Sequence, residues 1–252
     1  MLHEGSETMN ECLIKSKRRV QKHGEVFTPR RIVEMMLNIP EIKAACEDLT
    51  ATFLEPAAGE GAFLVAILER KLNIVKEKYN LDLNQFENFS LLALSTLYGI
   101  ELLEDNAQTC VMNMYELYYD YYREQARFHN GKVKKNVLAS AKEIISSNIA
   151  QGDFLKRKDG KGNPIVFSEW KPIHLRKNSK NIKVQRTEYT LEEIYQNVKK
   201  DSGLSVNRNG QKFQQLNIFD ILEIEVHFEE PKSMRYTIVP ITEVYKAEME
   251  EM

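Results

Sequence analysis

A turn of small side chains, residues 55–63, holds the residue types best suited to ligand binding. It follows a short apolar run and precedes a long apolar helical pattern, so it joins a strand to a helix. Small residues let a ligand lie against the backbone, and the first amides of the helix can donate hydrogen bonds to a carboxylate or phosphate. The residues of this turn that we expect to form the site are Glu55, Pro56, Ala58, Gly59, Gly61 and Phe63.

Two further acids stand at the ends of candidate strands. Glu101 ends the second strand, where an acid of a nucleotide-binding fold accepts hydrogen bonds from ribose hydroxyls; the alternative is a surface residue that caps the next helix. Asp153 follows the third strand and can accept a hydrogen bond from an exocyclic amine, while Phe154 beside it can stack on a flat ring. Three polar strand ends in chain order indicate one ligand site at the carboxyl edge of a sheet.

The elements that would position these residues alternate between strand and helix. The candidate strands are 52–54, 96–101 and a third strand and turn over 147–154, and the helical patterns between them are 62–79 and 105–127. This order predicts parallel strands joined by right-handed crossovers, an α/β sheet. Further along, residues 222–228 alternate strictly between apolar and polar and predict a half-buried strand that pairs with 234–239 as an antiparallel hairpin. The last residues, 244–252, have the pattern of a short acidic helix.

Composition and isolated residue types exclude several classes of protein. The 252 residues are 42% hydrophobic and 29% charged, which is typical of a chain with a packed core. No stretch approaches the roughly 18 consecutive apolar residues of a membrane span. The three cysteines and five histidines are widely spread, so neither a disulfide framework nor a metal site is expected, and a reducing, cytoplasmic setting is the economical interpretation. No Gly-Lys-Ser/Thr phosphate loop is present.

Charge is distributed unevenly along the chain. The net charge is −2, which excludes a globally basic nucleic-acid coat, yet residues 15–22 hold five basic side chains and no acid. Such a run can face phosphate, and it can equally be an ordinary solvated surface. The expected organisation is a basic lead-in over 1–24, a cofactor-binding domain over 25–170, a polar basic segment over 171–215, and a β-hairpin with an acidic tail over 216–252.

At this point four segments together resemble a known family. They are residues 24–33, 55–64, 99–101 and 148–154, and they follow the motif order of the N6-adenine DNA methyltransferases of restriction–modification systems, namely type I modification subunits and fused restriction–methylation enzymes. The resemblance covers roughly residues 15–155. Glu55 departs from the Asp with which the glycine loop of this family usually begins.

The resemblance implies a Rossmann-like methyltransferase fold that binds S-adenosylmethionine, with duplex DNA containing a target adenine as the substrate. A methyltransferase or specificity subunit is an implied partner, and no metal or membrane is implied. The residues that take a role by this resemblance are Phe27, Thr28 and Pro29 over the methionine end, Gly59 and Gly61 at the backbone contact, Glu101 at the ribose, and Asp153 with Phe154 at the adenine.

One family motif is missing from the chain. The family places Asn/Asp-Pro-Pro-Tyr/Phe after its fourth strand, where the polar group binds the target amine and the aromatic ring stacks on the flipped base. The nearest string is Asn163-Pro164, which lacks the second proline and the aromatic residue and lies within about ten residues of Asp153. Asn163 is therefore a weak candidate for the catalytic amine acceptor, and the alternative is a turn followed by a strand.

Three explanations of the missing motif stay open. The fold can be incomplete, with the catalytic loop supplied by another polypeptide. The chain can be a catalytically inactive subunit that binds a partner or DNA. Alternatively, it can be active through a different loop, in which Trp170 or Tyr189 would stack on the base.

Overall fold

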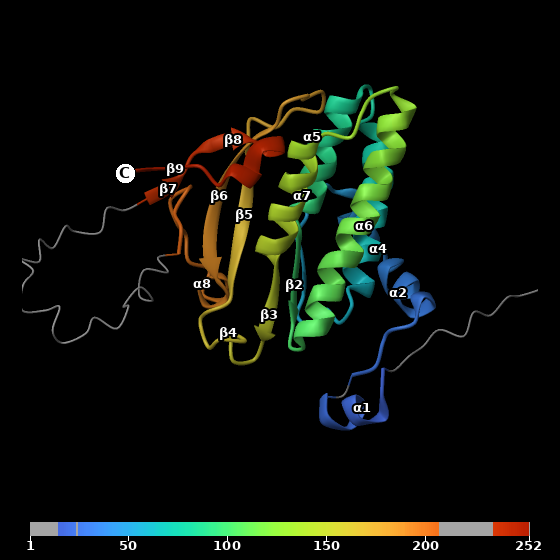
Figure 1. Cartoon of the computed structure of the whole chain (residues 1–252), viewed down its shortest axis with the longest axis vertical. Coiled ribbons are helices and arrows are strands. Elements are labelled where there is room, and N and C mark those ends of the chain that lie inside the picture. Colours follow the sequence, from blue (N-terminus) through green and yellow to red (C-terminus); the bar gives the residue numbers. More distant parts are fainter. Residues whose placement is uncertain (1–14, 24, 207–233, 252) are drawn as a thin grey trace, which may run out of the picture.

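Three short apolar strands run parallel at the centre of the molecule. The computed structural model describes residues 15–23, 25–206 and 234–251 and places these strands in one sheet (Figure 1). The strands of this sheet, in the order β1-β2-β3-β4, are Phe53–Glu55, Leu97–Glu101, Ile149–Asp153 and the antiparallel Lys158–Asp159. Glu55 pairs with Gly99 and Glu101 with Gln151, so the carboxyl ends of the three parallel strands meet at one edge. The α/β class predicted from the sequence is confirmed.

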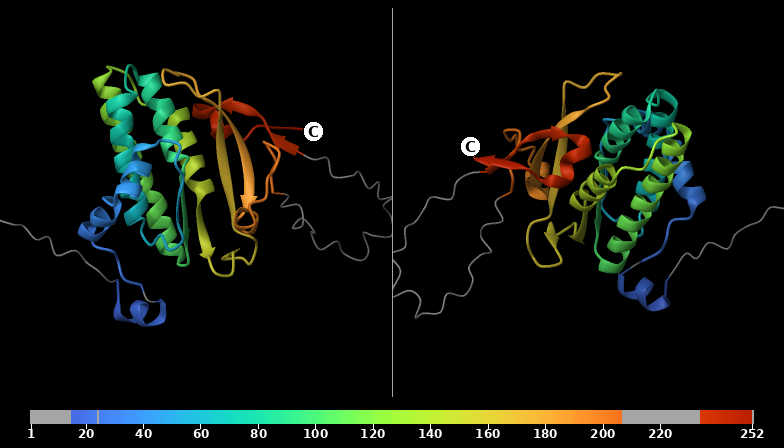
Figure 2. Two further views of the ribbon diagram at one scale, coloured as in Figure 1. Left: turned by 180° about the vertical axis from the view of Figure 1, so that it is seen from behind. Right: turned by 45° about the horizontal axis from the view of Figure 1, so that its top comes forward.

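The helices between these strands cover a single face of the sheet. Because the chain moves steadily from β1 to β2 to β3, right-handed crossovers must all pass on the same side. Figures 1 and 2 show this helical layer on one side of the molecule and the C-terminal strands on the other. The helices of the layer are α4 Ala62–Lys78, α5 Leu83–Leu94, α6 Glu104–Phe128 and α7 Lys135–Asn148. The sequence predicts α4 and α6 and, within α5, a helical stretch near 88–95, but it does not predict α7.

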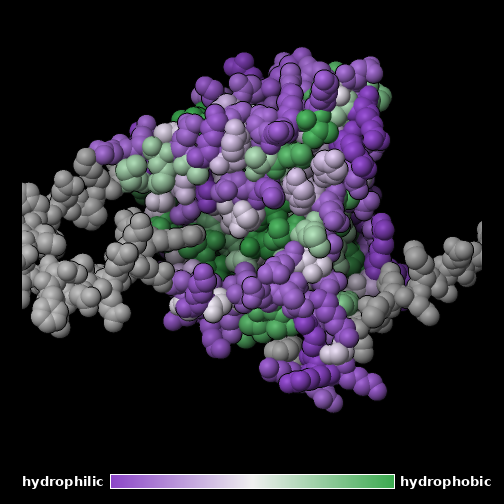
Figure 3. Space-filling view, in the orientation of Figure 1, coloured by the Kyte–Doolittle hydropathy of each residue, from purple (hydrophilic) through white to green (hydrophobic). Residues whose placement is uncertain are grey.

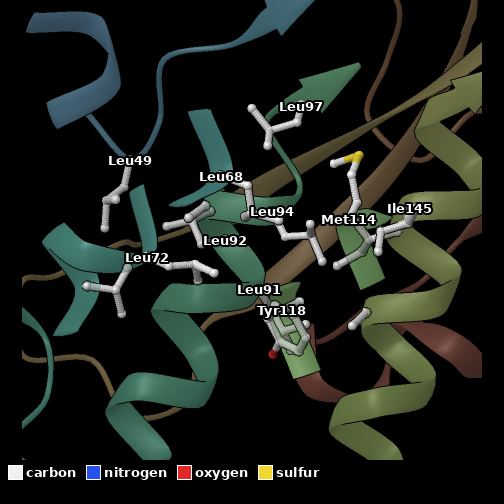
Figure 4. Close-up of a cluster of buried hydrophobic side chains, with 14 of the residues drawn as sticks. Leu49, Leu68, Leu72, Leu91, Leu92, Leu94, Leu97, Met114, Tyr118 and Ile145 are labelled. Carbon is white, nitrogen blue, oxygen red and sulfur yellow. The ribbon is translucent and has the colours of Figure 1, made fainter. Parts of the chain in front are cut away.

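The main core lies between this helical layer and the sheet. Figure 4 shows leucines of α4, α5 and β2 packed against Met114 and Tyr118 of α6 and Ile145 of α7. All of these side chains are buried, which is why the apolar spacing of α4 and α6 was readable from the sequence.

Three helices precede β1, and the second and third of them pack against α4. They are α1 Lys17–His23, α2 Arg30–Leu37 and α3 Pro40–Glu47. Arg70 of α4 donates hydrogen bonds to the Leu37 carbonyl at 2.6 Å and to the Glu34 carboxylate at 2.6 Å, which fixes α2. The buried amine of Lys71 donates to the carbonyls of Asp48 and Ala51, both at 2.8 Å, and so joins the chain after α3 to the start of β1.

The C-terminal strands form two antiparallel sheets. The elements are β5 Val166–Ile173, β6 Lys183–Thr190, α8 Leu191–Tyr195, β7 Met234–Tyr236, β8 Ile238–Pro240, the 3-10 helix η3 Ile241–Lys246 and β9 Met249–Glu251, with pairings β5-β6-β8 and β7-β9. The expected C-terminal antiparallel hairpin is seen as β7 with β9, and the expected strand 222–228 lies outside the described residues. β5 crosses the domain boundary expected at residue 170.

The structure of this region differs from the sequence-based description in two places. The segment 171–215, expected to be polar and basic, contains the strand β6, which was not predicted. Its inward side chains include the ion pair Arg186–Glu188, and these buried charges concealed the alternating pattern of a strand. The acidic helix expected over 244–252 is instead the end of η3 followed by β9, because Ala247 takes a left-handed backbone conformation that ends the helix.

The reversal of strand order that defines a doubly wound sheet is not found among the described strands. β1 is the first strand of the order β1-β2-β3-β4 and has a described neighbour on one side only. In the described ranges, no helix is long and apolar enough to cross a membrane.

Candidate functional site

The turn after β1 has the backbone shape that its glycines predict. Gly59 has φ +55° and Gly61 has φ +90°, a left-handed region that glycine enters without steric cost. A Cβ atom on Gly61 would come within 2.8 Å of the Cys110 sulfur, so this glycine is needed for close packing of α4 on α6. A Cβ atom on Gly59 would meet nothing within 4 Å, so that side of the turn is open to a ligand.

Glu101 holds the turn in place. One of its carboxylate oxygens accepts the Gly59 N–H at 2.8 Å, and the other accepts the Leu103 N–H at 2.9 Å. The side chain is buried, and the Ala58 N–H also donates to the Ile100 carbonyl at 2.9 Å. Each carboxylate oxygen keeps a second lone pair, but Glu101 is not itself among the residues that line the neighbouring cavity.

A cavity of about 800 Å³ opens beside this turn. Its walls come from the segment before α2, from the turn, and from facing sides of α4 and α6. Of the predicted site residues, the structure brings Phe27, Thr28, Pro29, Glu55, Ala58, Gly59 and Phe63 together in its lining. Pro56 and Gly61 belong to the same turn but do not line the cavity.

The cavity combines apolar walls with negative charge. Its lining includes the apolar side chains of Val26, Phe27 and Val33. It also includes five carboxylates and a single guanidinium, namely Glu55, Glu60, Glu69, Glu116, Asp120 and Arg30. Such a lining suits an organic ligand that carries positive charge.

The wall of the cavity that α6 forms was not predicted from the sequence. Asn113, Glu116, Leu117 and Asp120 face it from α6, and their spacing of three, four and seven residues places them on one face of that helix. The Asn113 amide donates to the Glu60 carbonyl at 2.9 Å, which ties α6 to the turn. The spacing of these residues was readable from the sequence, but nothing in the sequence placed that face of the helix opposite the glycine turn.

The N-terminal lead-in is clamped to the turn and to the start of α6. Lys15 forms ion pairs with Glu60 at 2.7 Å and with Asp105 at 3.3 Å. Arg19 pairs with Asp105 at 2.7 Å and with Glu25. The hydrogen bond from Arg19 holds the pKa of Asp105 down at about 2, and a second one lowers the pKa of Glu25. These pairs place residues 26–30 against the cavity.

Asp153 and Phe154 lie at the same carboxyl edge but outside the cavity lining. Asp153 accepts the Lys156 N–H at 3.0 Å and pairs with its amine at 3.2 Å, and the backbone hydrogen bond is the main cause of its lowered pKa. Phe154 is half-buried beside the second hydrophobic cluster, with its ring 6.1 Å from that of Tyr195. The register Glu101–Gln151 places Asp153 one strand away from Glu101.

Asn163 and Pro164 form part of the turn between β4 and β5. The Asn163 N–H donates to the Asp159 carboxylate at 2.8 Å, and its side-chain amide donates to the same carboxylate at 3.2 Å. Pro164 forms an isolated bridge with Lys158. The turn followed by a strand, which was the alternative interpretation of this string, is the arrangement in the structure. Within the described ranges, no group of three or more His, Cys, Asp or Glu could hold a metal ion.

Comparison with known proteins identifies the family. Residues 8–192 match the sequence model of the N-6 DNA methylases, which spans the parallel sheet, the glycine turn and the cavity lining. The curated proteins and the solved structures gave no match. Since the match covers well over half of the sequence, the chain belongs to the N-6 DNA methylase family.

Proposed function

We propose that this protein binds S-adenosylmethionine in the cavity beside the glycine turn and serves adenine-N6 methylation of DNA in a restriction–modification or phage-defence system of the cytoplasm. The observation that carries the proposal is the turn itself. The turn has two left-handed glycines, and the one that the buried Glu101 bonds, Gly59, lines an acidic cavity at the carboxyl edge of a parallel sheet.

The chemistry of the cavity fits this cofactor. S-adenosylmethionine carries positive charge on its sulfonium and its ammonium group, and the cavity offers carboxylates within apolar walls. Phe27, Thr28 and Pro29 would cover the methionine end, and the open side of Gly59 would admit the ligand to the backbone. Glu101 would accept the ribose hydroxyls through its remaining lone pairs, while Asp153 and Phe154 would meet the adenine at the next strand.

When bound, the cofactor would supply a methyl group on a sulfonium sulfur, which can leave as a neutral thioether. The residues of this chain contribute orientation and exclusion of water, because the clamp of Lys15 and Arg19 holds the lead-in against the cavity. The group that would polarise the target amine is not supplied by Asn163, whose amide is bonded to Asp159. We therefore propose that a partner polypeptide provides the catalytic loop.

The bonding of the Asn163 amide to Asp159 also favours a second candidate function. A chain without a catalytic loop can act as an inactive subunit that binds DNA or a partner, and three basic side chains of α1, Lys17, Arg18 and Lys22, are exposed and can face phosphate. Transfer of labelled methyl groups to duplex DNA separates the two candidates. We expect no transfer by the chain alone, transfer with the partner if the first candidate holds, and none in either case if the second holds.

Calorimetric titration with S-adenosylmethionine tests the cofactor proposal. Gly59→Asp should abolish binding, because it places a side chain in the open space of the turn. Gly162→Asp is the matched control, since Gly162 also has a left-handed backbone, φ +87°, with no atom near its Cβ position, but lies in the turn before β5. Equal affinity of wild type and Gly59→Asp would refute the proposal.

A further inference from the structure

The helix α1 has two sides that differ in exposure. With about 3.6 residues per turn, Lys17, Arg18 and Lys22 share one side that spans about 140° of the helix circumference. All three side chains are exposed, and none forms an ion pair with a residue that the structure describes. Arg19 and Val20 lie on the other side and are half-buried. Because the helix contains no acid, its exposed side presents three uncompensated positive charges.

The half-buried side of α1 is joined to the walls of the cavity. Lys15, two residues before the helix, pairs with Glu60 at 2.7 Å, and its amine lies 5.8 Å from the centre of the Phe27 ring. Both Glu60 and Phe27 line the cavity. Arg19 pairs with Asp105 at 2.7 Å, at the start of α6. A displacement of α1 would therefore move or release side chains that line the cavity.

The order of α1 depends on these contacts. Helices shorter than about 12 residues are marginal when isolated in water, and α1 has seven residues. Figures 1 and 2 show α1 at the end of the molecule, apart from the helical layer. It forms no extensive interface with another described helix or strand, so the side chains of Lys15 and Arg19 are its main ties. A ligand that binds the ordered helix on either side therefore favours the same ordered state.

The exposed side of α1 lies at the end of the molecule that a substrate must approach. Glu60 follows β1 and Asp105 follows β2, so the helix that pairs with them stands at the carboxyl edge, beside the cofactor cavity. Figure 3 shows hydrophilic surface at the lower end of the molecule, where Figure 1 places α1. Exposed lysines and arginines bind the phosphates of a nucleic acid backbone, each neutralising one phosphate. Position and charge together favour duplex DNA as the partner of this side.

We propose that α1 couples the binding of DNA to the binding of the cofactor. Its exposed side, Lys17, Arg18 and Lys22, contacts phosphates of duplex DNA, while Lys15 and Arg19 hold the same helix against the cavity. This proposal rests on the proposed function, because it requires S-adenosylmethionine in that cavity. Both ligands draw on one ordered lead-in, so each should strengthen the binding of the other by the same factor. Contacts to the DNA backbone position the duplex and do not read its sequence.

The exposed-side variant, Lys17→Gln with Arg18→Gln and Lys22→Gln, tests the DNA contact. Glutamine has a helix propensity close to that of lysine and arginine, so the variant removes charge and keeps the helix. Anisotropy of a short fluorescent duplex, titrated with the full-length chain over a range of salt concentrations, measures the affinity. The variant should bind about tenfold more weakly at low salt, and the slope of log affinity against log salt should become shallower by about 2.7, or about 0.9 for each lost phosphate contact.

Three exposed lysines at the other end of the molecule provide a matched control. Lys78 ends α4, Lys132 lies between α6 and α7, and Lys135 begins α7, and none of them forms an ion pair with a described residue. Replacing all three with glutamine makes the same change in net charge and should leave DNA affinity and salt slope close to those of the wild type. Equal affinity of the two triple variants, or no binding of the duplex by the wild type, would overturn the proposal. Binding to phosphatidylserine vesicles but not to the duplex would assign the exposed side to a membrane and would overturn it as well.

Calorimetric titration with S-adenosylmethionine, with and without saturating duplex, tests the coupling. In the wild type the duplex should tighten cofactor binding about fivefold, a factor at the lower end of allosteric couplings. In the exposed-side variant the cofactor should bind without DNA as it does to the wild type, because Lys17, Arg18 and Lys22 do not line the cavity. The duplex should no longer tighten binding in this variant. The same tightening in both proteins, or none in the wild type, would overturn the coupling.

The two experiments separate the role of α1 from the proposed function. If the wild type binds no S-adenosylmethionine, the proposed function is refuted and the coupling with it, while a salt slope that differs between the two triple variants still establishes the DNA contact. If the cofactor binds and the two triple variants have the same affinity for DNA, the proposed function stands and the role of α1 is wrong.

Discussion

At the scale of single residues, the site depends on side chains that hold the backbone in an unusual shape. Glu101 is the clearest case, because the carboxylate assigned to a ribose also accepts the N–H of Gly59. In the proposed complex, one residue would couple the shape of the turn to the ligand. The sequence could indicate an acid at a strand end, but it could not show that the acid bonds to a turn more than forty positions away.

Gly61 tests the packing of this turn. Gly61→Ala should destabilise the protein by about 2–3 kcal/mol, because it combines a left-handed backbone with a 2.8 Å approach to the Cys110 sulfur. Gly162→Ala has the same backbone problem without the contact and should cost about 1 kcal/mol. Urea unfolding of both variants measures the difference, and equal losses would show that the contact with Cys110 is unimportant.

The buried amine of Lys71 should make the free energy of unfolding depend on pH. Burial lowers its pKa from 10.5 to about 8, so between these values the unfolded chain binds more protons and this residue makes stability rise with pH. The comparison variant is Lys71→Met, which cannot titrate. From pH 7 to pH 9.5 the free energy of unfolding of wild type should gain about 2 kcal/mol relative to the variant. A constant difference over this range would contradict the buried, partly neutral amine.

At the scale of elements, the sequence predicted those whose buried side is uniformly apolar. β1, β2, α4 and α6 carry regular apolar spacing, and all four are present. β6 was missed because its buried positions hold Thr187, Glu188 and the partner of that acid, Arg186. The polar wall of the cavity on α6 was visible as a pattern, but its role depends on the lead-in and the turn, which only the fold brings opposite it.

The ion pairs of Lys15 and Arg19 should hold the N-terminal lead-in against the cavity. Asp105→Asn should release the segment around Lys15 and Arg19, so trypsin should cut there faster and S-adenosylmethionine should bind several-fold more weakly. Glu124→Gln on the same helix removes only its surface pair with Lys76 and is the control. High salt should reproduce the effect of Asp105→Asn in the wild type. Unchanged cleavage in Asp105→Asn would mean that the ion pairs do not hold the lead-in.

At the scale of the whole molecule, the described parallel strands form a sheet whose edge at β1 is open. The parallel strands run in one direction from β1, the helices lie on one face, and the opposite face is covered at β2 and β3 but not at β1. The sequence could not show this open edge, because it is a property of strand order and not of residue pattern.

The most direct measurement of the central claim is photo-crosslinking of labelled S-adenosylmethionine to the full-length chain, followed by peptide mapping. The account predicts label on the segments that line the cavity, residues 26–30 and 57–63, and loss of that label in Gly59→Asp but not in Gly162→Asp. Label confined to other segments, or label that persists in Gly59→Asp, would contradict it.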